Sequence, residues 1–198
     1  MKKSANKLTD KLVLYQINED EDKDLYSYGI WQGIVLFFNF ATALAISCSF
    51  QMLWQGIVFT IAYGFLRSYA GGYHSRTQTG CYLFSVVLIS AVLSLIKFAP
   101  WNNAGTAVIL MLSATIILAL SPQEDENKKL DEKEQIVFKK RTRIVLFVLI
   151  GLALLSNYIG KLSFSICIVM SIATSAFMLV LGKGKTLFKP KRDKKLRG

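Results

Sequence analysis

The chain has 198 residues, of which 53% are apolar and 19% charged, and 24 Lys and Arg against 13 Asp and Glu give it a net charge of +11. A soluble domain carries roughly 25% charged residues. Five long blocks contain no charged residue, which excludes a disordered chain and argues against a soluble globule: 25–66, 77–96, 98–123, 144–160 and 162–182. We therefore expect an all-α integral membrane protein.

The segment 1–24 places apolar residues among lysines, a pattern typical of an amphipathic helix at the membrane interface. A membrane-spanning helix needs about 20 apolar residues. The block 25–66 therefore has the length of two spans, and the polar residues Ser47 and Gln51 predict a tight hairpin near Phe50. Each later block predicts one span. The six expected helices are 26–48, 52–68, 80–97, 103–121, 143–160 and 162–182.

Six spans place both termini on one side of the membrane, and basic residues mark the cytoplasmic side. Of the 24 Lys and Arg, only Lys97 and Lys161 fall on the opposite side, so the termini and the charged loop 122–143 are expected to be cytoplasmic. This bias accounts for the net charge without nucleic-acid binding, and the basic tail is expected to contact anionic lipid. The predicted organisation is an interfacial segment, a membrane domain and a basic tail: 1–24, 25–182 and 183–198.

The segment 67–81, between the second and third spans, departs from the apolar pattern. It holds the only His of the chain, His74, and a Cys seven residues later, Cys81. A thiolate can attack a peptide carbonyl, while an imidazole takes the thiol proton and returns it to the leaving amine. We therefore predict Cys81, in the first turn of the third span, as a nucleophile and His74 as its base.

Four neighbouring residues are candidates for supporting this chemistry. Gly71 and Gly72 permit close backbone approach, and their N–H groups are candidate oxyanion donors. Arg67 is a candidate for holding a substrate carboxylate or carbonyl, and Gln78, a backbone carbonyl or a distant acidic residue for orienting the imidazole. The same residues also fit a plain interfacial turn. One His and one Cys are too few ligands for zinc, so neither a metal nor another cofactor is expected.

The run Arg67-Ser-Tyr-Ala-Gly-Gly-Tyr-His74, followed by Cys81, resembles the signature of the accessory gene regulator B (AgrB) family, which are membrane endopeptidases of bacterial quorum-sensing systems. The length, the six predicted spans and the charged loop beginning Ser121-Pro122 extend the resemblance over essentially the whole chain. It implies a cysteine peptidase with Cys81 as nucleophile and His74 as base, and it associates the positions of Arg67 and Gly72 with activity.

The resemblance further implies an AgrD-like precursor peptide as substrate. Its C-terminal tail would be cleaved through a thioester on Cys81, and the remainder would close into a thiolactone or lactone ring. It also implies a homodimer in the bacterial cell membrane, with the active site at the cytoplasmic face. Three lysines are candidates for a diffuse attraction of an acidic substrate tail, although the topology bias already explains them without any substrate: Lys128, Lys129 and Lys133.

The alternative is a non-enzymatic membrane protein, either a small transporter or an assembly partner for peptide export. A transporter is expected to carry polar or ionisable residues within its spans. The spans here offer Gln32, Asn39, Gln55 and scattered Ser and Thr, with no acidic residue. The peptidase is therefore the better fit.

Overall fold

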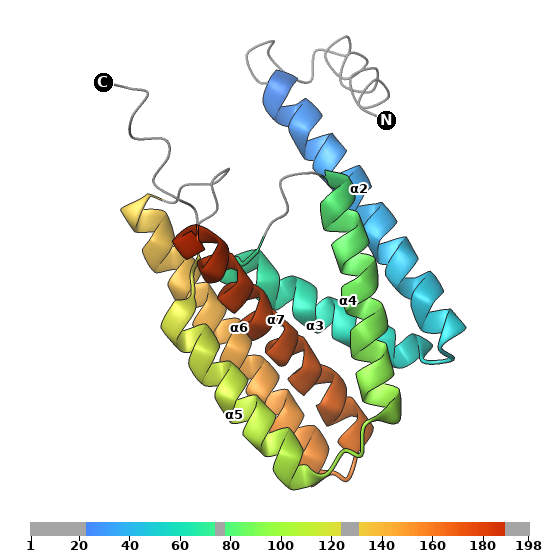
Figure 1. Ribbon diagram of the computed structural model, residues 1–198. Helices are drawn as coiled ribbons and strands as arrows, with labels where there is room; N and C mark the ends of the chain where they lie inside the picture. The colour runs from blue at the N-terminus through green and yellow to red at the C-terminus, as the bar shows by residue number, and fades with distance from the viewer. Residues whose placement is uncertain (1–22, 74–77, 124–130, 189–198) are drawn as a thin grey trace. The chain divides into compact units, whose positions relative to one another are not determined.

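The computed structural model describes residues 23–73, 78–123 and 131–188, and these residues contain six α-helices and no strand (Figure 1). The helices are α2 Lys23–Ser49, α3 Leu53–Ala70, α4 Gln78–Phe98, α5 Asn103–Leu120, α6 Glu132–Tyr158 and α7 Leu162–Phe188. The all-α prediction is thus confirmed for the described part of the chain. The predicted amphipathic helix in 1–24 lies almost entirely outside it. The chain forms two compact units, residues 1–45 and 46–198, and the second contains α3 to α7.

Three of the described helices are long and apolar enough to cross a membrane. They are the stretches Thr79–Phe98, Asn103–Leu120 and Leu162–Gly184, and a shorter apolar helix covers Gly33–Ser49. Many large apolar side chains of α4, α5 and α6 are exposed, as expected of surfaces that contact lipid. The six-span topology itself remains a prediction.

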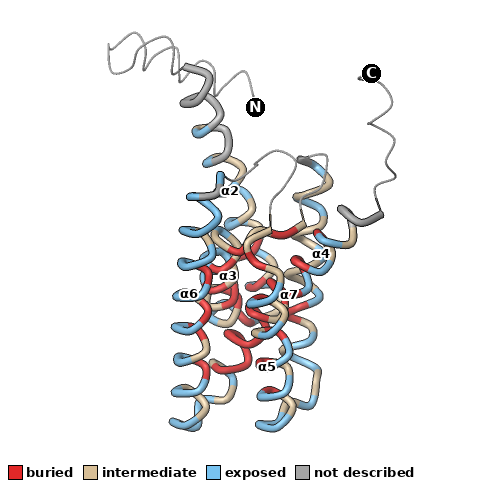
Figure 2. The backbone as a smooth tube through the Cα atoms, turned by 90° about the vertical axis from the view of Figure 1, so that its left-hand side faces the viewer, coloured by how far each residue is buried: buried red, intermediate tan, exposed pale blue. Residues whose placement is uncertain are grey.

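Helix α7 is the centre of the second unit. It packs against α3, α5 and α6 and more lightly against α4, and α5, α6 and α7 lie side by side (Figure 1). Figure 2 shows the buried residues gathered where these helices meet. Small hydroxyl residues on α7 permit this close approach, because Ser171, Thr174 and Ser175 turn their hydroxyls onto carbonyls of their own helix.

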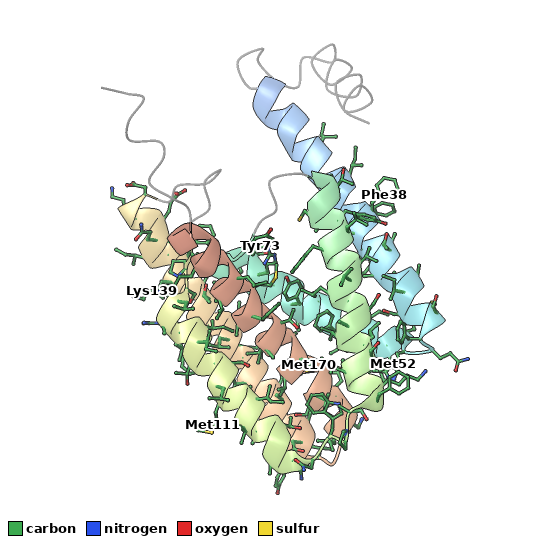
Figure 3. All side chains as sticks on the ribbon, viewed as in Figure 1. Phe38, Met52, Tyr73, Met111, Lys139 and Met170 are labelled. Atoms are coloured by element: carbon green, nitrogen blue, oxygen red, sulfur yellow. The ribbon has the colours of Figure 1, made fainter. Side chains whose placement is uncertain are left out.

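The hairpin predicted near Phe50 is confirmed. Helix α2 ends at Ser49 and α3 begins at Leu53, and the Met52 N–H donates to the Ser47 carbonyl over 2.9 Å. The Lys97 Nζ donates to the Phe50 carbonyl over 3.1 Å, so the end of α4 lies beside this turn. In Figure 3, Met52 and Tyr73 mark the two opposite ends of α3.

Helix boundaries within the charged segments differ from those predicted. Helix α6 begins at Glu132, inside the predicted loop 122–143, because the Asp131 N–H donates to the Glu134 carboxylate and caps a charged helical extension. Helix α7 likewise continues to Phe188, beyond the predicted end at 182. Hydropathy marks the part of a helix that fits a membrane, and a helix can extend into water past that part.

Candidate functional site

The C-terminal end of α3 turns sharply at two glycines. Gly71 has φ 77° and its N–H donates to the Arg67 carbonyl over 3.1 Å, which caps the helix. A Cβ at Gly71 would collide with the backbone carbonyl oxygen of Gln123. Position 71 therefore requires glycine for its left-handed conformation and for the close passage of a second segment of backbone.

Gly72 is buried and brings the chain against α7. It has φ 130°, and a Cβ there would lie 3.1 Å from the Arg67 Nη1 and 3.3 Å from the Met178 carbonyl oxygen. The next residue, Tyr73, donates its N–H to the Met178 carbonyl over 3.0 Å. The segment 71–73 is therefore docked onto α7 through backbone atoms.

Arg67 reaches into this turn from the last turn of α3. Its Nη2 donates to the Tyr73 carbonyl over 2.5 Å, and its guanidinium carbon lies 5.9 Å from the centre of the Tyr63 ring. Its Nη1 is buried and has no hydrogen-bond partner among the described residues. Leaving a buried donor unsatisfied costs about 1–3 kcal/mol, and more when it is charged. Arg67 thus orients the turn with one nitrogen, while its other terminal nitrogen is buried without an acceptor from the described residues.

Cys81 is the fourth residue of α4 and is half-buried. One helical turn further along α4 is Phe84, and the centre of its ring lies 5.6 Å from the centre of the Tyr73 ring. The end of segment 71–73 therefore contacts the start of α4. On α3, the Tyr63 ring lies beside the Arg67 guanidinium, so it adds an aromatic ring to this region. The start of α4 and the end of α3 therefore belong to one site. All three thiols are free, with Cys48 exposed and Cys167 buried.

The structure brings together Arg67, Gly71, Gly72 and the helix that carries Cys81. His74 lies outside the described residues, directly after Tyr73. Gln78 begins α4, but its side chain is outside the described part. Of the three lysines considered for substrate attraction, Lys133 is exposed in the first turn of α6, and the other two, Lys128 and Lys129, are outside the described residues.

The structure adds three residues that the sequence did not single out: Tyr63, Gln123 and Met178. Tyr63 lies four residues before Arg67 on α3. Residues with this spacing are neighbours on a helix surface, so the sequence could have indicated that Tyr63 lies beside Arg67. The contribution of Met178 is a backbone carbonyl, which has no sequence signature. Gln123 contributes backbone and side-chain groups across a long sequence separation.

Comparison with known proteins identifies relatives over most of the chain. Residues 3–179 match the family described as Accessory gene regulator B. Putative AgrB-like protein 2 of Clostridium perfringens strain 13 is 26% identical over 165 residues, covering 79% of this chain and 77% of that protein. Protein FsrB of Enterococcus faecalis OG1RF is 28% identical over 119 residues, covering 58% of this chain and 49% of that protein. No solved structure matches the chain.

Proposed function

The chain belongs to the accessory gene regulator B family, and from this premise we propose that it is a membrane cysteine endopeptidase that processes a short AgrD-like precursor peptide. Family membership ties the chain to the agr quorum-sensing system, in which the family is linked to the AgrD precursor. Its apolar helices agree with a membrane protein. The observation that carries the proposal is the contact of segment 71–73, which leads to His74, with the start of the helix bearing Cys81.

In the proposed reaction, the Cys81 thiolate attacks a peptide carbonyl on the C-terminal side of the signal sequence. His74 takes the thiol proton and returns it to the leaving amine, so that the C-terminal tail departs and the remainder stays on Cys81 as a thioester. A Cys or Ser side chain of the peptide then attacks the thioester and closes the ring. A thioester retains most of the acyl-transfer potential of the cleaved bond, so ring closure proceeds without ATP.

The surrounding groups have distinct proposed roles. The buried Arg67 Nη1 would receive a substrate carbonyl or carboxylate, since it has no partner within the described residues. The Gly71 N–H is engaged by the helix cap, so we assign the oxyanion role to the Gly72 N–H. Exposed Lys133 would attract an acidic substrate tail together with Lys128 and Lys129. We also propose that two copies of this chain form a homodimer in the cell membrane.

The proposal predicts a covalent acyl-enzyme. The purified chain in lipid is incubated with a candidate precursor. This precursor is an amphipathic peptide with an acidic tail, encoded by a short gene next to the gene for this chain. Mass spectrometry is expected to find the Cys81-containing fragment heavier by the mass of the peptide remainder, and hydroxylamine is expected to remove the added mass because it cleaves thioesters. An adduct on Cys48 in place of Cys81, or cleavage with no thioester during the first turnover, would contradict the mechanism.

The native cysteines test the proposed six-span orientation. A membrane-impermeant maleimide is expected to label the exposed Cys48 on intact cells and to label Cys81 only in inverted vesicles, since the two lie near opposite ends of the second unit. Buried Cys167 is expected to stay unlabelled in both. The Cys48→Ser variant serves as the control and should lose the label on intact cells. Labelling of Cys81 on intact cells would overturn the orientation.

A further inference from the structure

The side chain of Gln123 is inserted against the backbone of α7. With its amide oxygen and nitrogen assigned from the hydrogen-bond network, it donates to the Leu179 carbonyl over 2.9 Å and accepts from the Lys183 N–H over 2.6 Å. Residues 179 and 183 are four apart, so the two groups are the carbonyl and the N–H of one turn of α7, and the amide of Gln123 lies along that turn. The amide of glutamine supplies, from two separate atoms, both the donor and the acceptor that these contacts use.

The backbone around Gln123 is equally constrained. The Gln123 N–H donates to the Ala70 carbonyl over 3.0 Å, and Gly71 pairs with Gln123 in a parallel bridge. On the other side, a Cβ at the buried Gly182 would lie 3.0 Å from the Gln123 Cδ. Two glycines therefore make room for this one residue, one on the α3 turn and one on α7.

One turn of α7 binds both segment 71–73 and Gln123. Its Met178 carbonyl accepts from the Tyr73 N–H, and its next carbonyl, that of Leu179, accepts from the Gln123 amide. Through the Ala70 and Gly71 contacts, Gln123 holds the start of segment 71–73, while Met178 and Arg67 hold its end. The residue that follows this doubly held segment is His74.

We propose that Gln123 is a positioning residue for the reaction, because it ties segment 71–73 to α7 and thereby sets where His74 stands relative to Cys81. The kinetic part of this inference rests on the proposed function. Gln123 does not touch the reacting atoms. It acts through the backbone of Ala70 and Gly71, and without it the segment is tied to α7 only at its Tyr73 end, by Met178.

The test compares Gln123→Met and Gly182→Ala with the matched control Gly184→Ala, in the full chain in lipid. Methionine keeps the length of glutamine without its hydrogen bonds, and the Gly182→Ala methyl displaces the amide. The Gly184→Ala variant makes the same change on the same helix where no atom lies within 4 Å. Amide hydrogen exchange is read by mass spectrometry, together with kcat and KM for cleavage of the adjacent-gene peptide.

Both test variants are expected to speed exchange in residues 70–73 about tenfold or more while the interior of α4 is unchanged, because the loss is local. The kcat is expected to fall about 10- to 100-fold with little change in KM, as for a misplaced catalytic group. The control is expected to match the wild type in both measurements.

Unchanged exchange in residues 70–73 in Gln123→Met would overturn the inference, as would faster exchange with an unchanged kcat. A rise in KM alone would also overturn it, because it would make the segment a binding surface. If the wild-type chain itself fails to cleave the peptide, the proposed function falls, and the exchange measurement still decides whether Gln123 holds the segment.

Discussion

The Cys81→Ala variant is expected to insert into the membrane normally and to cleave no precursor, and His74→Ala is expected to lose cleavage as well. Removing the nucleophile of a catalytic unit, or its base, costs on the order of 10⁶-fold in rate. Cys81 is half-buried at the start of α4, so truncation to alanine removes a single sulfur without opening the core. Cleavage is measured by mass spectrometry of the peptide after incubation with each purified variant.

The matched control is Cys48→Ala, which removes the exposed thiol at the other end of the second unit and should retain wild-type cleavage. Equal yield in the membrane fraction shows that each variant inserts. Full processing by Cys81→Ala or by His74→Ala would refute the peptidase mechanism and would favour the non-enzymatic alternative.

The helices of this chain were predictable because charge is confined to their ends. The uncharged blocks located α3, α4 and α5 within a few residues, and the polar residues near Phe50 located the hairpin. The start of α6 at Glu132 was not predictable in this way. A charged helix in water leaves no apolar block, and its cap, the Asp131–Glu134 contact, is a local hydrogen bond.

The sequence predicted those residues of the candidate site whose side-chain type is distinctive, and not the residues that contribute backbone groups. Arg67, Gly71, Gly72 and Cys81 stood out because their residue types are unusual beside apolar spans, and the structure brings this segment together. The partners of the turn are carbonyls, those of Tyr73 and Met178, which every residue possesses. Gln123 is separated from Gly71 by two complete helices, so only the fold brings the two into contact.

The Gly71→Ala variant is expected to reduce cleavage about 100-fold, since displacing a catalytic group by about 1 Å has an effect of this size. A φ of 77° is strained for alanine by about 1–3 kcal/mol. The added methyl would also meet the Gln123 carbonyl oxygen, a backbone atom that cannot rotate away. The turn must therefore move, and Tyr73 and the residue after it move with it.

The control for this variant is Gly64→Ala, two turns earlier on α3, where no atom lies within 4 Å of the added methyl. Alanine there is expected to stabilise the helix by roughly 0.5–1 kcal/mol and to leave cleavage unchanged. Both substitutions replace glycine by alanine, one within α3 and one at its C-cap. The difference in cleavage between the two variants therefore measures the effect of distorting the turn. Equal cleavage by Gly71→Ala and Gly64→Ala would mean that the Gly71–Gln123 contact has no bearing on the reaction.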